Sequence, residues 1–180
     1  MLYLLKNKKF FYPILIVLFL IGSALMLKSL FYFLFLQVII PDHTPHLSIN
    51  DLQKLNSDTV LLLDTRSSEE FSVSHLKGAS WVGYEEFTLE QFDDLPSDTT
   101  IVLYCSVGYR SDVVGKRLKD AGFTNVYNLW GGIFAWVNKG LPVYDEQSVT
   151  QNIHPYSASW GFWLTRGKKV MQSYKTVIED

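Results

Sequence analysis

The chain has 180 residues, with 16 Lys and Arg against 18 Asp and Glu, a formal net charge of -2, four His and one Cys. A single Cys excludes an internal disulfide and a cysteine-rich zinc site, and the near-neutral charge argues against a nucleic-acid-binding surface. The chain contains neither common phosphate-binding glycine loop and no internal repeat. Because the four His show no metal-ligand spacing, no metal and no other cofactor is predicted.

The first predicted element is an apolar segment, residues 10–40, in which 25 of 31 side chains are hydrophobic and only Lys28 is charged. Residues 10–27 carry no charge, and as a helix they would extend about 27 Å, close to the thickness of a bilayer core of about 30 Å. The second apolar run, residues 30–40, is too short to cross a bilayer alone. The sequence therefore predicts one transmembrane helix that anchors the chain in lipid.

The charges around this segment predict its orientation. A basic N-terminal flank, residues 1–9, carries Lys6, Lys8 and Lys9. Only Lys28 follows the uncharged stretch, so the positive-inside bias predicts a single-pass protein with a cytoplasmic N-terminus and an extracytoplasmic domain. A cleaved signal peptide is the alternative, since residues 22–24 are small. Cleavage there would leave a second apolar stretch exposed, which favours the anchor.

The rest of the chain divides into a linker, residues 41–45, a folded domain, residues 46–144, and a tail, residues 145–180. Ser48 and Asp51 resemble a capping box that opens a short helix through Leu55. The tail is rich in aromatic and basic residues, namely Tyr156, Trp160, Phe162, Trp163, Lys168 and Lys169. We expect it to form an appended helix that packs its aromatic side chains on the domain, with contact to a lipid surface as the alternative.

Strands and helices are predicted to alternate through the domain. The apolar runs 60–63 and 101–104 have the pattern of strands buried on both faces of a parallel sheet, and 81–82 and 126–129 are shorter strand candidates. Helices are predicted at 68–75, 86–92, 111–121 and 133–138. This alternation predicts an α/β fold, a doubly wound parallel sheet with helices on both faces.

Polar chemistry follows the two long strands, at the edge where ligands of such sheets gather. Asp64 and Arg66 follow the first strand, and Cys105 follows the second. A glycine-containing turn then leads from Cys105 to Arg110 and into a predicted helix. Such a turn can aim several backbone N–H groups at one point. Together with Arg110, these donors are expected to favour the nucleophilic thiolate of Cys105 and to hold a persulfide after sulfur uptake.

Four segments in this order resemble motifs of the rhodanese-like sulfurtransferases. Residues 63–66 resemble the family's D-x-R motif, and residues 74–79 resemble G-H-I-P-G-A with Ser and Lys in place of Gly and Pro. Residues 105–110 resemble the active-site loop, and the segment 131–143 resembles the closing G-G-x-x-x-W and G-x-P pattern. The resemblance covers roughly residues 46–144 and implies a single-domain rhodanese-like fold behind the membrane anchor.

The resemblance also implies a function. Cys105 would be the catalytic residue, taking a sulfane sulfur from thiosulfate or another persulfide donor and passing it to cyanide or to a thiol, on a small molecule or a protein. The substrate-binding loop would consist of Ser106, Val107, Gly108, Tyr109 and Arg110. The supporting residues would be Asp64, Arg66 and His75. Asp64 and Arg66 are expected to hold the scaffold by pairing with Glu69, Glu70 or loop amides.

The length of the active-site loop separates the sulfurtransferases of this family from the related phosphatases. Cys105 to Arg110 is six residues, the length that goes with sulfur substrates, whereas the related phosphatases have one residue more. Residues 106–109 carry no Lys or Arg, so a neutral or protein-bound persulfide donor stays as open as thiosulfate. Two alternatives remain: a binding module or persulfide carrier without turnover for a membrane partner, and a cysteine phosphatase or arsenate reductase.

Overall fold

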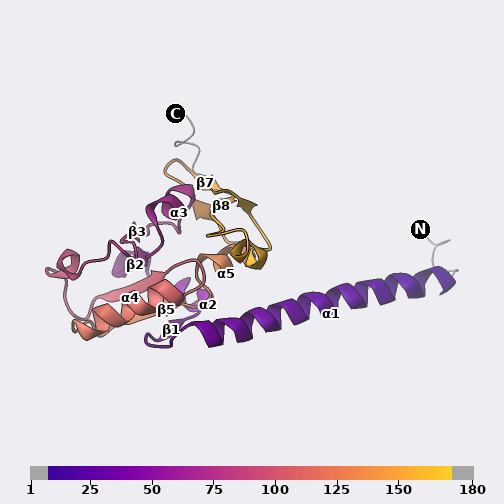
Figure 1. Ribbon diagram of the computed structural model, residues 1–180, viewed down its shortest axis with the longest axis horizontal. Helices are drawn as coiled ribbons and strands as arrows, with labels where there is room; N and C mark the ends of the chain where they lie inside the picture. Colours follow the sequence, from indigo (N-terminus) through magenta and orange to yellow (C-terminus); the bar gives the residue numbers. More distant parts are fainter. Residues whose placement is uncertain (1–7, 172–180) are drawn as a thin grey trace. The chain divides into compact units, whose positions relative to one another are not determined.

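A computed structural model describes residues 8–171 of the chain. Most of the predicted basic flank, residues 1–7, and the last nine residues of the tail lie outside the described residues. The chain divides into two compact units, one ending at Val38 and the other beginning at Ile39. The two units are the apolar helix and the folded domain, shown in Figure 1.

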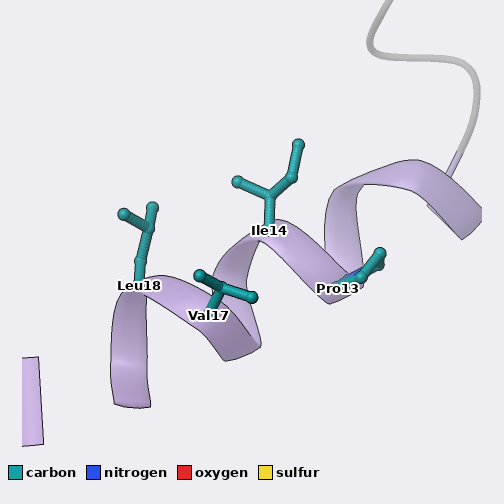
Figure 2. A pocket seen from close by; sticks show the side chains of 4 residues that line it. All are labelled: Pro13, Ile14, Val17 and Leu18. Atoms are coloured by element: carbon teal, nitrogen blue, oxygen red, sulfur yellow. The ribbon is translucent and has the colours of Figure 1, made fainter. Parts of the chain in front are cut away.

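The apolar segment forms one helix, α1 (Lys8–Ile39), of 32 residues. Its two apolar runs are continuous in this helix, and side chains such as Phe19, Met26 and Val38 are exposed by 74%, 76% and 83%. Tyr12–Ile39 is long and apolar enough to cross a membrane, a property that an N-terminal signal sequence would share. A shallow hollow on the helix is lined by Pro13, Ile14, Val17 and Leu18 (Figure 2). Because this lining is entirely apolar, the hollow offers no group for chemistry.

The folded domain is built on a parallel sheet in the order β1-β5-β4-β2-β3. Its strands are β1 (His46–Leu47), β2 (Val60–Asp64), β3 (Ser80–Trp81), β4 (Thr100–Tyr104) and β5 (Val126–Leu129). The central strand β4 pairs with β2 in a register that places Asp64 opposite Tyr104. This pairing brings the residues that follow β2 and β4 to the same edge of the sheet, as the sequence predicted.

The helices are α2 (Ile49–Leu52), α3 (Ser68–Val73), α4 (Tyr109–Asp120) and α5 (Gly132–Asn138). Ser48 caps α2, its hydroxyl accepting a hydrogen bond from the amide of Asp51, as predicted. The expected helix at 86–92 is wrong, since only a 3-10 turn, η3 (Leu89–Phe92), forms there. Thr88, the residue before that turn, makes no side-chain cap to start an α-helix. A second 3-10 turn, η2 (Ser57–Thr59), precedes β2.

One face of the sheet carries the main apolar core, which joins strand residues to α4 and to the segment around η3. Its buried members are Leu63, Val82, Phe87, Phe92, Ile101, Leu103, Val114, Leu118 and Val126. Because side chains alternate along a strand, Tyr104 points to the other face, where its hydroxyl accepts a hydrogen bond from the amide of Leu76, 3.1 Å away. The domain therefore has a parallel sheet with packed side chains on both faces.

The described part of the tail is not the helix that we expected. It forms β7 (Val149–Thr150), which pairs with β6 (Val143–Tyr144) at the end of the predicted domain, then β8 (Asn152–Ile153), η4 (Trp160–Trp163) and β9 (Lys168–Lys169). The backbone explains the error, because Pro155 lacks an N–H group and Tyr156 has a φ of 63°, which a right-handed helix cannot use. Asn138 of α5 then holds the returning chain, donating to the carbonyl of Trp163 and accepting from the amide of Thr165.

Candidate active site

Cys105 lies directly after β4, the central strand, and is 1% exposed. The backbone N–H of Gly108 donates to its Sγ across 3.1 Å. Gly108 has a φ of 117°, which allows the chain to turn from the strand into α4 one residue later. A strand, a glycine turn and a helix therefore place a backbone N–H donor on the sulfur of Cys105.

The N-terminus of α5 fixes the carbonyl side of the same loop. The amide of Ile133 donates to the Cys105 carbonyl at 2.9 Å, and the amide of Phe134 donates to the Ser106 carbonyl at 3.0 Å. This approach requires Gly132, because a Cβ there would lie 2.2 Å from the Cys105 oxygen, and its φ is 55°. The Gly131-Gly132 pair of the sequence motif therefore allows the N-terminus of α5 to contact the loop after Cys105.

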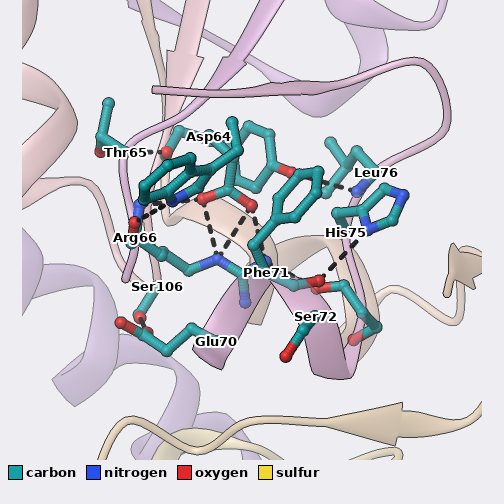
Figure 3. Close-up of polar contacts among 12 residues, drawn as sticks. Asp64, Thr65, Arg66, Glu70, Phe71, Ser72, His75, Leu76 and Ser106 are labelled. Atoms are coloured by element: carbon teal, nitrogen blue, oxygen red, sulfur yellow. Dashed lines mark hydrogen bonds and ion pairs between the residues drawn. The ribbon is translucent and has the colours of Figure 1, made fainter. Parts of the chain in front are cut away.

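Arg110 forms a bidentate pair with Glu70 of α3. Its Nη1 lies 2.7 Å from Glu70 Oε2 and its Nη2 lies 2.9 Å from Glu70 Oε1. The hydroxyl of Ser106 also donates to Glu70 Oε1 at 2.8 Å, an interaction drawn in Figure 3. The ring of Tyr156 lies 5.1 Å from the guanidinium carbon, within cation–π range. Arg110, the predicted substrate-binding cation, is thus paired with the Glu70 carboxylate and packed against the Tyr156 ring.

The pKa values of this pair follow from burial and from the two opposite charges. Burial would raise the pKa of the Glu70 carboxyl, but the hydrogen bonds and charge of Arg110, with the charge of Arg66, lower it below the ordinary value. Burial would lower the pKa of the Arg110 guanidinium, but Glu70 and the nearby Cys105 raise it instead. Both partners are therefore charged at neutral pH, and Glu70 offsets much of the positive charge that Arg110 brings to the loop.

Asp64 and Arg66 form a second pair, in which both side chains are fully buried. Arg66 Nε lies 2.9 Å from Asp64 Oδ1, and Nη2 lies 2.6 Å from both Asp64 Oδ2 and the Ser74 carbonyl (Figure 3). Among the described residues, Arg66 Nη1 and Ser74 Oγ have no hydrogen-bond partner. The expectation that these two residues hold the scaffold fits this geometry, but Arg66 pairs with Asp64 itself, and Glu70 pairs with Arg110.

His75 contacts α3 and β6. Its Nδ1 lies 3.2 Å from the Phe71 carbonyl, and its ring stacks on the Phe71 ring at 4.1 Å (Figure 3). Its backbone forms an antiparallel bridge with Tyr144, with N to O distances of 2.8 and 2.9 Å. These contacts join the helix after β2 to the end of the predicted domain, and a supporting role for His75 at the site stays a prediction.

The other loop residues contribute backbone rather than charge. Ser106 and Val107 are 4% exposed, whereas the side chain of Tyr109 is exposed and stands at the start of α4. Ser111 Oγ donates to Asn128 Oδ1 at 2.8 Å, and Asn128 Nδ2 donates to the Gly108 carbonyl at 2.9 Å.

Within the described range, no three His, Cys, Asp or Glu side chains are grouped as they would be around a metal ion.

Three features of this site were not predicted from the sequence. They are the pairing of Glu70 with Arg110, the hydrogen bonds of Asn128 and the contact of Tyr156 with Arg110. Glu70 stands three residues after Ser67, and the two form a capping box at the start of α3, a pattern that the sequence did contain. Asn128 is a polar residue inside an apolar strand, which is a recognisable signal of a buried hydrogen-bond role. Tyr156 has no local signal, because its contact depends on how the tail returns.

Comparisons with known proteins identify the domain that carries this site. The rhodanese-like domain profile matches residues 48–139. A sulfurtransferase of Allochromatium vinosum is 32% identical over 88 residues, which cover 49% of this chain and 81% of that protein. Thiosulfate sulfurtransferase GlpE of Actinobacillus succinogenes is 30% identical over 95 residues, covering 53% of this chain and 85% of that protein.

Solved structures give the same fold. A rhodanese-related protein from Thermoplasma volcanium superimposes with a TM-score of 0.50 at 26% identity, covering 57% of this chain and 99% of the other. The predicted fold class is thereby confirmed. The chain spans only 26% and 21% of the lengths of two larger curated relatives that it also matches, so it corresponds to one part of each.

Proposed function

This chain belongs to the rhodanese-like domain family, and from that premise we propose that it is a sulfurtransferase that carries a sulfane sulfur as a persulfide on Cys105. The observation that carries the proposal is the Gly108 amide directed at Cys105 Sγ across 3.1 Å. A donor held in place before reaction stabilises negative charge on the sulfur without reorganisation. The same donor suits the thiolate before sulfur uptake and the anionic persulfide after it.

The reaction proceeds in two transfers. The Cys105 thiolate attacks the outer sulfur of the donor, a new S–S bond forms, and the donor's own S–S bond breaks with its electron pair leaving as sulfite or as a thiolate. A nucleophilic acceptor, cyanide or a thiolate, then attacks the outer sulfur of the persulfide. The bond to Sγ breaks, its electron pair returns to Cys105, and the starting thiolate is restored.

The charge balance at Arg110 supports a monoanionic persulfide rather than thiosulfate as the better donor. Thiosulfate carries two negative charges and needs a cation that is not already neutralised. The Arg110 guanidinium is paired twice with Glu70 and lies under Tyr156, and residues 106–109 bring no further cation. A persulfide donor on a small thiol or a protein needs less positive charge at the loop.

The test is sulfur transfer by the full chain in detergent, with thiosulfate and with glutathione persulfide as donors and cyanide as the acceptor. We expect turnover that disappears in Cys105→Ser, a larger kcat/KM for the persulfide, and one added sulfur atom on Cys105 by mass spectrometry. Absence of both turnover and added sulfur with either donor would refute the proposal. Cys105-dependent hydrolysis of an aryl phosphate would instead favour the phosphatase alternative.

A persulfide carrier without turnover has one observation in its favour, the 1% exposure of Cys105. A thiol this well covered reacts only after a local opening, and a carrier would have that opening made by its partner. Single-turnover loading of Cys105 without cyanide-dependent release distinguishes the carrier from the enzyme. In that case a partner complex should survive in Cys105→Ala.

We further propose that α1 anchors the enzyme in a membrane as a single-pass helix, with the domain on the extracytoplasmic side. The proposal is supported by the length and apolar composition of Tyr12–Ile39 and by the excess of Lys before it. The lipid would then be a permanent partner, and the sulfur donor and acceptor would be molecules of that compartment.

A further inference from the structure

The segment that leaves α1, residues 40–45, is attached to the first turn of α4. The amides of His43 and Thr44 donate to the two carboxylate oxygens of Asp112, at 3.2 and 3.0 Å. Thr44 Oγ1 donates to the Asp112 carbonyl at 3.0 Å. Thr44 is 1% exposed and Asp112 is fully buried. The exit segment is therefore bound to the helix that begins directly after the cysteine loop.

The fit between this segment and α4 is close. Gly115 faces Thr44, and a Cβ at Gly115 would lie 2.5 Å from Thr44 Oγ1 and 2.9 Å from Thr44 Cγ2. One turn further along, Lys119 Nζ donates to the His43 carbonyl at 3.0 Å. A residue without a side chain thus lets the exit segment lie directly on the helix.

The other end of the segment is bound to the same strand residue that holds the loop. The backbone N–H of Asn128 donates to the Pro45 carbonyl at 2.9 Å. The side chain of Asn128 donates to the Gly108 carbonyl at 2.9 Å and accepts from Ser111 Oγ at 2.8 Å. Asn128 is fully buried, so displacement of the segment would leave buried polar groups without their hydrogen-bond partners.

Ile40 completes the contact from the side of the loop. It is 4% exposed, and its Cδ1 would lie 3.0 Å from a Cβ placed on Gly108. Gly108 therefore packs against Ile40, and its carbonyl is held by the Asn128 side chain and by the Asp112 amide at 3.1 Å. Its N–H is the donor to Cys105 Sγ.

From this arrangement we propose that Ile40 and Thr44 are positioning residues for Cys105, which keep the Gly108 N–H aimed at the sulfur. Residues directly after the apolar helix, outside the part that the rhodanese-like profile matches, would thus set the reactivity of the thiol. The inference rests on the proposed function only in taking Cys105 as the reacting group.

The test is the pH profile of Cys105 alkylation by iodoacetamide in the full chain in detergent. Because the chain has one Cys, the label reports on Cys105 alone. In Ile40→Ala and in Thr44→Val, the midpoint of the profile is expected to move to higher pH by about 0.5 unit or more, since the thiolate loses part of its donor. The Gly108 amide should also exchange with solvent several-fold faster by NMR.

Two matched controls separate positioning from general loss of stability. Ile101→Ala makes the same change at a fully buried residue at the other end of β4, and Thr88→Val makes the same change at an exposed Thr. Both should keep the profile and the Gly108 exchange of the native chain. The proposal is overturned if Ile101→Ala moves the midpoint as far as Ile40→Ala, or if the exit-segment variants match the native chain in both readouts. Failure of sulfur transfer would leave both readouts measurable.

Discussion

At the scale of single residues, the loop around Cys105 depends on close approaches more than on charge. Gly132 lets α5 reach the Cys105 carbonyl, and Gly108 makes the turn that returns an amide to the sulfur. The one cation of the loop, Arg110, is balanced by Glu70. The structure thus places one backbone donor, the Gly108 N–H, at the sulfur, and the paired charges of Arg110 and Glu70 lie beside the loop.

Gly132→Ala tests the close approach of α5. The new Cβ would lie 2.2 Å from the Cys105 carbonyl oxygen, so we expect a large fall in the free energy of unfolding and loss of Cys105 loading with sulfur. Gly122→Ala is the matched control, because Gly122 also has a positive φ, 101°, but a Cβ there meets no atom within 4 Å. The control should lose only the backbone strain of about 1–2 kcal/mol. Equal losses in the two variants, measured by chemical denaturation, would contradict the steric argument.

Glu70→Gln tests the carboxylate that balances Arg110. Because a charged, buried partner becomes neutral, we expect the free energy of unfolding to fall by about 1.5–3 kcal/mol. The uncompensated guanidinium should also improve the use of thiosulfate relative to glutathione persulfide. Glu69→Gln is the control, since Glu69 is the adjacent exposed carboxylate. An unchanged donor preference in Glu70→Gln would show that the Arg110 charge does not select the donor.

At the scale of elements, the tail is the part that local sequence described least well. Its short strands and η4 are joined to α5 through Asn138 and to the site through Tyr156. The turn at Pro155 is organised by His154, whose Nδ1 accepts from the Tyr156 amide at 3.1 Å and whose Nε2 lies 3.0 Å from the Met171 carbonyl. Because His154 holds the turn at Pro155 in place, Tyr156 lies against the Arg110 guanidinium.

The turn predicts a dependence of stability on pH. Burial lowers the pKa of His154 below its ordinary value of 6.5, against the opposing influence of Glu70 and of the Met171 carbonyl. The unfolded chain then binds the proton more readily than the folded chain, so stability is full above about pH 6.5 and falls as the pH drops through the folded pKa. Denaturation measured from pH 7.5 down to 5.5 should show a decline of at most about 1.4 kcal/mol per pH unit from this group.

His154→Gln supplies the control for that measurement. Glutamine does not titrate, so the variant should be less stable at pH 7.5 but should lose less stability than the native chain on acidification. If the two chains decline in parallel, His154 is not the group responsible.

At the scale of the whole molecule, the chain joins an apolar helix to a domain that carries nearly all of the charge. Residues 10–40 hold one charged side chain, whereas the other 149 residues hold 33. The helix and the domain are separate compact units, but the segment after the helix belongs to the domain. Cleavage at residues 22–24 would remove only the first part of α1, and its second apolar run and the exit segment would stay with the domain.

The membrane proposal predicts where the full chain is found. It should sediment with membranes, stay there through washes with high salt and alkaline carbonate, and be released by detergent. With a C-terminal tag, the domain should be digested by protease added outside intact cells if the N-terminus is cytoplasmic. A mature protein that is soluble and lacks the first residues by mass would establish the signal-peptide alternative instead.

Features that depend on neighbouring residues could be predicted from the sequence alone. The apolar helix, the strands β2, β4 and β5, the cap at Ser48 and the loop from Cys105 to Arg110 all follow from local composition and periodicity. Tertiary structure decided the rest. Glu70 pairs with Arg110 across 40 positions of the chain and Thr44 reaches Asp112 across 68. The described part of the tail folds as strands and turns where a helix was expected. These contacts form only when distant segments are closed on the sheet, because burial, rather than local preference, selects which polar groups must meet.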